Sequence, residues 1–305
     1  MWNIDLTRLE TALFTKRRII DYPRGEPISL VQLLVQLAPH IPHSEWGERI
    51  DAGGVHVNGI AALANRELLP PVRVEYFEPR DPSSPSLKHP LWSSMWIVYE
   101  DDEIIIVNKP ARLPTLPVRE QISFNLRRYL EQYSGASVHL PSRLDTSTSG
   151  LVVASKSPLT HRPLQHAFEQ RLVRKSYLCE ISSPVSFSQV TVASPIGRHP
   201  LHPVLRATHS RGKDALTIFS VIEHRTSTTL VDATPVTGRT HQIRVHAASL
   251  GCPLVGDNFY NGKESPCLHL CCAALAFPHP RTGDWIDVRL PETAVPDWVR
   301  TQVSD

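Results

Sequence analysis

Pro141-Ser-Arg-Leu-Asp-Thr-Ser-Thr-Ser-Gly150 is a run of small and hydroxylated residues around one acid, and the apolar run Leu151-Val-Val-Ala154 follows it directly. Ser and Thr hydroxyls bond nearby amides and glycine tolerates a positive φ, so the first stretch predicts a bent loop. The apolar run predicts a buried strand. Asp145 and Arg143 therefore lie in a loop anchored by a buried strand, where a carboxylate can be held rigidly and still face a cleft.

A second stretch, Thr237-Gly-Arg-Thr-His-Gln-Ile-Arg-Val-His246, favours a catalytic role for Asp145 in the first stretch. An isolated Asp among Ser and Thr is more often a turn cap than a catalytic group. Together, however, the two stretches resemble the RluA-type family of pseudouridine synthases, whose signature is His-Arg-Leu-Asp, two variable residues and Thr-Ser-Gly. Ser142 stands where the family usually has His, and the matching residues are Arg143, Leu144, Asp145, Thr148, Ser149 and Gly150.

Further motifs of the family occur in the same order between residues 108 and 280, and this order makes the resemblance specific. Any one of them alone would be weak. They are Asn108-Lys109-Pro110, Lys175 with Tyr177, Gly238 to Arg244, Gly256-Asp257 with Tyr260, Leu268-His269 and Phe277 to Pro280; Asn261 comes between Tyr260 and Gly262.

The resemblance implies an α+β pseudouridine synthase fold, with a mixed, largely antiparallel sheet flanked by helices. It implies an isomerase that converts uridine in structured RNA to pseudouridine, with rRNA favoured over tRNA as the substrate. The reaction breaks the N1–C1′ bond, turns the uracil and rejoins it through C5, so no cofactor and no metal are expected. In the family pattern Asp145 is the catalytic carboxylate, Arg244 its ionic partner and Tyr177 the residue that stacks on the uracil, with Leu270 as a candidate for the apolar wall.

RNA contacts are expected from basic residues near these motifs. Arg143 is a candidate for the RNA backbone or for the place that a flipped base vacates. Residues 198–213 lack apolar periodicity and carry several Arg and His side chains, which predicts an exposed basic loop. The complete set of RNA-binding candidates is Arg143, Lys175, Arg206, Arg239 and His241.

The chain is expected to have four parts. Residues 1–22 form an N-terminal extension, because Leu6, Leu9, Leu13 and Phe14 have helical spacing. Residues 23–79 resemble the small α/β RNA-binding fold named after ribosomal protein S-four, with few basic residues. Residues 80–93 have the Pro and Ser content of a linker, and residues 94–305 form the catalytic domain.

Within the catalytic domain, local patterns predict several elements. These are a hairpin over 96–107, a helix that Ser123 caps and Gly135 ends, a helix that begins at Ser157-Pro158, strands over 174–181, 216–222 and 228–236, and a helix that Thr240 caps and Gly251 ends.

Composition sets broad limits. The formal net charge is +2, which is too small to indicate nucleic acid by itself. Cys267, Cys271 and Cys272 lack the paired spacing of zinc sites, and the odd total of five cysteines favours free thiols in a reducing compartment. No apolar run approaches the roughly 18 residues of a membrane span. We therefore expect a cytoplasmic monomer that uses RNA as its partner and does not enter a membrane.

Two other functions are compatible with parts of the sequence. The first is a catalytically inactive RNA-binding relative that acts as an RNA chaperone or assembly factor; Ser142 and the charge-poor N-terminal unit favour it, whereas Asp145, Tyr177 and Arg244 oppose it. The second is a Ser/His/Asp hydrolase. The absence of a Gly-x-Ser-x-Gly turn around Ser149 opposes this function.

Overall fold

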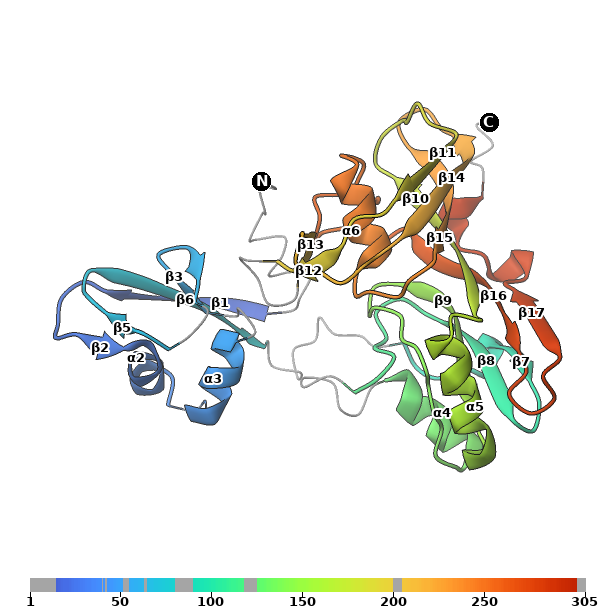
Figure 1. Ribbon diagram of the computed structural model, residues 1–305, viewed down its shortest axis with the longest axis horizontal. Helices are drawn as coiled ribbons and strands as arrows, with labels where there is room; N and C mark the ends of the chain where they lie inside the picture. Colours follow the sequence, from blue (N-terminus) through green and yellow to red (C-terminus); the bar gives the residue numbers. More distant parts are fainter. Residues whose placement is uncertain are drawn as a thin grey trace.

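The computed structural model describes residues 15–39, 41, 43–51, 55–62, 65–79, 90–117, 125–199 and 205–300. The chain forms two lobes, each built around its own sheet and its own hydrophobic core (Figure 1). The smaller lobe contains the N-terminal elements, and the larger lobe contains every element from residue 94 onward.

The smaller lobe joins a four-stranded sheet to two helices. The strand order is β1 (Thr15–Tyr22), β6 (Val72–Pro79), β3 (Val55–Val57) and β4 (Ile60–Ala61), and short strands β2 (Ile28–Ser29) and β5 (Glu67–Leu68) pair separately. Helix α2 (Leu30–Leu37) begins with a capping box between Ser29 and Gln32. Helix α3 (His43–Asp51) places Trp46 edge-on to Tyr76 of the sheet, with ring centroids 4.9 Å apart.

The predicted boundary between an extension and the smaller lobe is wrong. Residues 15–22 are not part of a separate extension, because β1 pairs antiparallel with β6 along its whole length, from Thr15 opposite Pro79 to Tyr22 opposite Val72. A strand gains its hydrogen bonds from a partner that is distant in sequence, which the helical spacing of residues 6–14 could not reveal. Residues 1–14 and most of the predicted linker, residues 80–89, lie outside the described residues.

The larger lobe is built on a nine-stranded sheet with the order β11-β14-β15-β10-β16-β9-β8-β7, in which β17 pairs with β16. All pairings are antiparallel except that of β16 with β9. This is the mixed, largely antiparallel α+β sheet that the sequence predicted. The strands are β7 (Ile97–Glu100), β8 (Ile104–Lys109), β9 (Ser149–Ser155), β10 (Arg174–Ile181), β11 (Gln189–Val192), β14 (Thr217–His224), β15 (Thr229–Pro235), β16 (Leu270–Pro278) and β17 (Trp285–Arg289).

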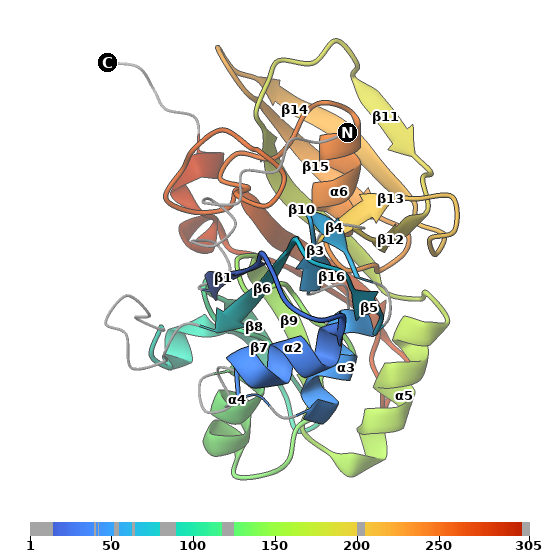
Figure 2. The ribbon, with the colours of Figure 1, turned by 90° about the vertical axis from the view of Figure 1, so that its left-hand side faces the viewer.

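Three α-helices cover the sheet. Helices α4 (Leu126–Ser134) and α5 (Pro158–Glu169) lie beside the half that contains β7 to β9 (Figure 2). Helix α6 (Gln242–Ser249) lies beside the other half, against β14, β15 and the short strand β13 (Arg206–Thr208). Short 3-10 turns lie at η1 (Ser94–Trp96), η2 (Glu292–Ala294) and η3 (Asp297–Val299).

The predicted cap is right for α5 and wrong for α4 and α6. Ser157 caps α5 as predicted, and Gly135 ends α4 in the left-handed conformation. Helix α4 is capped by Asn125; Ser123 lies outside the described residues. Thr240 does not cap α6, because His241 occupies the cap position with φ 57° and makes no side-chain cap hydrogen bond.

The basic segment 198–213 is not the wholly exposed loop that its composition predicted. Strand β12 (Ile196–Arg198) pairs with β13 (Arg206–Thr208), and Leu205, directly before β13, is buried. Apolar residues at the base of this hairpin join a small core with Val245 of α6, so the segment is fixed to the catalytic lobe. Residues 200–204 lie outside the described residues.

The centre of the sheet holds the loop that contains Asp145. Strands β8 and β9 are almost entirely buried, and the loop at residues 141–148 leads directly into β9. Gly150 in β9 has φ 109°, and a Cβ there would collide with the backbone of Cys272 in β16. This position therefore requires glycine, and the close approach of the two strands fixes the end of the loop. In the part of the chain that the structure describes, no helix combines the length and apolar character needed to cross a bilayer.

Candidate active site

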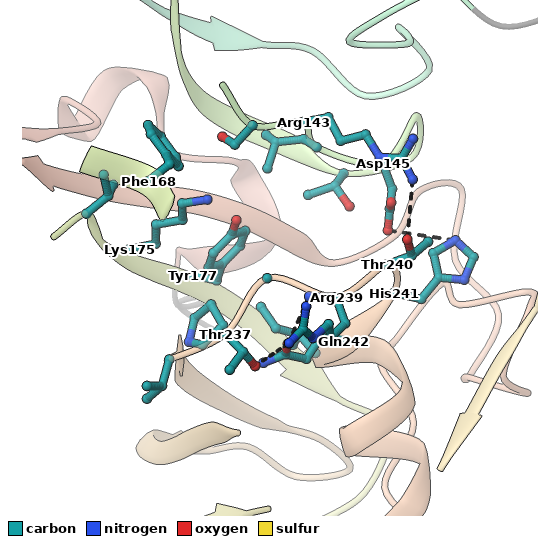
Figure 3. A pocket seen from close by; sticks show the side chains of 18 of the residues that line it. Arg143, Asp145, Phe168, Lys175, Tyr177, Thr237, Arg239, Thr240, His241 and Gln242 are labelled. Atoms are coloured by element: carbon teal, nitrogen blue, oxygen red, sulfur yellow. Dashed lines mark hydrogen bonds and ion pairs between the residues drawn. The ribbon is translucent and has the colours of Figure 1, made fainter. Parts of the chain in front are cut away.

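A cavity of about 540 Å³ lies at the end of the Asp145 loop. This volume is in the range of about 300–1,000 Å³ that small-molecule sites occupy. Its walls come from four parts of the larger lobe: the loop at 141–148, the end of α5, strand β10 and the segment 235–244, with Leu270 of β16. Figure 3 shows side chains from these segments pointing into one space.

Asp145 is held in the cavity by a rigid loop. Its side chain is 23% exposed, so the carboxylate is reachable but largely desolvated. The Thr148 amide donates to the Asp145 carbonyl oxygen at 3.0 Å. The Thr115 hydroxyl donates to the carbonyl of the preceding residue, Leu144, at 2.7 Å. These bonds fix the backbone on both sides of the carboxylate.

The surroundings of Asp145 favour its ionised form. Burial raises the pKa of its carboxyl group, but the neighbouring basic groups outweigh burial and hold the pKa below its ordinary value; they are His241, Arg244, Arg143 and Lys109. The nearest atoms of two of these groups are 3.7 Å from Oδ2 for Arg244 Nη1 and 3.9 Å for His241 Nε2. Asp145 is therefore a carboxylate at neutral pH.

Arg244 is paired more closely with a second carboxylate than with Asp145. Its Nε and Nη2 donate to the two oxygens of Asp257 at 2.8 and 2.6 Å, and both side chains are buried. The guanidinium also lies over the rings of Phe259 and Tyr260, at 4.6 and 5.2 Å from their centroids. The predicted contact with Asp145 exists, but the fork geometry that fixes Arg244 comes from Asp257.

His241 lies inside the site rather than on its rim. Its Nδ1 is 2.8 Å from the Tyr260 hydroxyl, and its Nε2 faces Asp145. Burial lowers the pKa of His241 to about 4, and Arg244 acts in the same direction. The imidazole is therefore neutral at neutral pH, and RNA contact by His241 stays a prediction.

Tyr177 and Lys175 both line the cavity from β10, as their alternation predicted. Tyr177 is buried, and burial raises the pKa of its hydroxyl well above the ordinary value, so the ring is neutral. Lys175 places its Nζ 4.8 Å from the centroid of the Phe168 ring. Burial lowers the pKa of Lys175. The two side chains form an aromatic and a basic wall (Figure 3).

Of the other predicted residues, Arg143 and Arg239 line the cavity and Arg206 does not. Arg143 Nη2 donates to the Thr240 hydroxyl at 3.3 Å, across the mouth of the cavity (Figure 3). Arg239 Nε donates to the carbonyl of Asp214 at 2.9 Å. Arg206 lies behind His241, where its amide donates to the Tyr260 hydroxyl at 3.0 Å.

Lys109 is a site residue that the sequence-based list omitted. It is fully buried, and its Nζ donates to the carbonyls of Leu113, Pro110 and Thr146 at 2.8, 2.9 and 3.5 Å. Burial lowers its pKa to about 7, although Asp145 raises it. Lys109 thus stabilises the loop that contains Asp145 by a hydrogen bond to the carbonyl of Thr146.

Asp257 and Tyr260 were also absent from the predicted site. A signal for both residues and for Lys109 was present, because all three fall in the ordered motifs noted above. Their roles depend on contacts that only the fold creates. Among the described residues, no group of three or more His, Cys, Asp or Glu side chains could hold a metal ion.

Comparison with known proteins places this arrangement in one family. A family model described as RNA pseudouridylate synthase matches residues 103–249. A Vibrio vulnificus protein named dual-specificity RNA pseudouridine synthase RluA is 35% identical over 221 residues, which cover 68% of this chain and 83% of that protein. A Nitrosomonas europaea protein named ribosomal large subunit pseudouridine synthase D is 37% identical over 207 residues, which cover 66% of this chain and 56% of that protein.

A solved structure supports the same assignment. Human RNA pseudouridylate synthase domain containing 1 superposes with a TM-score of 0.57 at 26% sequence identity, covering 67% of this chain and 86% of the human chain.

Proposed function

Since the chain belongs to the RNA pseudouridylate synthase family and is an RNA pseudouridine synthase, we propose that Asp145 is its catalytic carboxylate and that it acts on a uridine in structured RNA. The observation that carries this proposal is the position of Asp145. It is ionised and partly exposed in a cavity, beside a buried arginine that a second carboxylate holds in place.

The reaction requires such a group. The N1–C1′ bond of the uridine breaks, the uracil turns, and a new bond forms between C5 and C1′. C5 then loses its proton to solvent and N1 gains one, so nothing is oxidised or reduced. The Asp145 carboxylate supplies the electron pair, either as a nucleophile toward the sugar or base or as a base toward a sugar proton.

Tyr177 and Arg244 take complementary roles in this proposal. The Tyr177 ring lines the cavity and stacks on the flipped uracil, because an aromatic face suits any base. Arg244 is the cation near Asp145, at 3.7 Å, and favours its ionised form.

RNA binding is assigned to the basic side chains around the cavity. Arg143, Lys175 and Arg239 line it and meet phosphates or fill the place that the target base leaves. Arg206 is half-buried behind His241, so its contribution to RNA contact is the weakest of the predicted set.

The favoured substrate is rRNA, with tRNA as the second candidate. The relative from Nitrosomonas europaea is named for the large ribosomal subunit, and the relative from Vibrio vulnificus is named as dual-specificity. We place this chain in the cytoplasm as a monomer that requires neither a cofactor nor a metal.

The test is tritium release from C5-labelled uridine in bulk RNA of a strain that lacks this gene. Wild-type protein is expected to release tritium, and Asp145→Asn is expected to release none. Asp287→Asn is the matched control, because this aspartate is half-exposed on β17, away from the cavity, and should behave like wild type.

Two results would contradict the proposal. Tritium release by Asp145→Asn at the wild-type rate would remove Asp145 from catalysis. If neither wild type nor the variant released tritium and both bound RNA, the chain would instead be an RNA-binding chaperone or assembly factor.

A further inference from the structure

The turn at residues 256–262 is a rigid support beneath the site. The Gly256 amide donates to the Lys263 carbonyl at 2.7 Å, and the Gly262 amide donates to the Asp257 carbonyl at 2.9 Å. Gly256 has φ 74°, and a Cβ there would collide with the backbone of Cys267. The turn therefore holds Tyr260 in a fixed position next to His241.

The two ring nitrogens of His241 have different neighbours. Nδ1 is 2.8 Å from the Tyr260 hydroxyl, and Nε2 is 3.9 Å from Asp145 Oδ2. A neutral imidazole carries one N–H, and the carboxylate favours the tautomer whose N–H faces it. Nδ1 then carries a lone pair and accepts a hydrogen bond from the Tyr260 hydroxyl. The Arg206 amide, at 3.0 Å, donates to the oxygen of the same hydroxyl.

The charges around His241 agree with a neutral ring. Burial lowers its pKa, and Arg244 on the same helix lowers it further. Asp145 in the loop and Asp257 in the turn raise it, and Arg206 on β13 lowers it. Together these effects give His241 a pKa of about 4, so its ring is unprotonated near neutral pH.

We propose that Tyr260 is a positioning residue of the active site, which holds His241 in the Nε2–H tautomer so that a neutral hydrogen-bond donor faces the Asp145 carboxylate. The proposal rests on Asp145 being the catalytic carboxylate. A neutral donor orients Oδ2 without cancelling the negative charge that the reaction uses. The distance of 3.9 Å is longer than a hydrogen bond, so the bond from Nε2–H to Oδ2 would form only when bound substrate brings the two groups closer.

The direct test is the tautomer of His241, read from imidazole ¹⁵N shifts of ¹⁵N-histidine-labelled protein at pH 7. The signals of His241 are assigned by their loss in His241→Gln. Wild type is expected to show a lone pair on Nδ1 and a proton on Nε2. In Tyr260→Phe we expect a mixture of the two tautomers. Wild-type protein with the proton on Nδ1, or with a charged ring, would overturn the proposal.

The kinetic test uses the same variants in the tritium-release assay. Tyr260→Phe is expected to lower kcat by about fivefold to tenfold at an unchanged KM, the effect of one hydrogen bond. Tyr129→Phe is the matched control, because this buried hydroxyl donates to the Pro90 carbonyl at 3.2 Å, away from the cavity. It should leave kcat unchanged.

A double-mutant cycle separates positioning from general support. Gln at position 241 keeps a side-chain N–H and has no tautomers, so Tyr260→Phe should change kcat by less than about twofold in His241→Gln. An equal loss in both backgrounds, or no loss in wild type, would overturn the proposal. If Asp145→Asn proved active, the proposed function would fail, whereas the tautomer measurement would still report the Tyr260–His241 contact.

Discussion

Replacing Asp257 by Asn tests the idea that a second carboxylate fixes Arg244. The change removes the charge that accepts two hydrogen bonds from Arg244, at 2.8 and 2.6 Å, in a place where both side chains are buried. Breaking a buried ion pair by removing one partner costs about 3–5 kcal/mol, because the other charge stays buried and unpaired. Asp145 offsets part of this cost, since it lies 3.7 Å from Arg244. We therefore expect a loss of about 3 kcal/mol in the free energy of unfolding.

The measurement is urea denaturation followed by circular dichroism, with the slope of the transition compared between variants. Glu131→Gln is the matched control, since it breaks the Arg127–Glu131 ion pair on the exposed face of α4. An exposed i,i+4 pair contributes only about 0.3–0.5 kcal/mol. A loss below about 1 kcal/mol for Asp257→Asn, or one no larger than that of the control, would refute the assignment of Asp257 as the partner that fixes Arg244.

Three other changes test separate parts of the site. Because the pKa of Asp145 is held below its ordinary value of about 3.9 and that of His241 is about 4, kcat/KM should stay level as pH falls from 7 to about 5 and decrease below this. A decrease that begins above about pH 5 would contradict the electrostatic argument. Tyr177→Phe should keep the KM for RNA, whereas Tyr177→Leu should raise it about tenfold because stacking is lost; equal KM values would argue against stacking. Gly150→Ala should destabilise the protein by more than about 2 kcal/mol, because a Cβ would collide with Cys272. Gly283→Ala, at φ 79° with open space around it, should cost only about 1 kcal/mol in the same urea-denaturation assay. A smaller difference between the two variants would indicate that β9 and β16 separate easily.

Local sequence was sufficient for much of the larger lobe. The hairpin of β7 and β8, the start of α5 at Ser157 and the buried strand after Gly150 follow from apolar runs, a capping side chain and turn residues. These features depend on neighbours within a few residues. The start of α6 was misplaced because His241, and not Thr240, occupies the cap position, in a left-handed conformation that no local pattern indicates.

Pairing between strands that are distant in the chain could not be predicted from local sequence. Strand β1 joins β6 across more than fifty residues, as the register from Arg18 opposite Tyr76 shows, and no pattern within residues 15–22 indicates this partner. The hairpin of β12 and β13 was hidden in the same way, because its basic composition resembled a loop while its pairing depends on the core around Leu205 and Val245.

The sequence alone determined which chemical groups the protein has: an acid in a turn before a buried strand, an aromatic and a lysine on one face of β10, and arginines in the second motif. The tertiary structure decided which of these groups meet. Asp257 rather than Asp145 holds Arg244 by two hydrogen bonds, and the Tyr260 hydroxyl contacts His241 Nδ1. The reason is physical, because the energy of a charge or a hydrogen bond depends on distance and solvent exposure, and chain packing sets both.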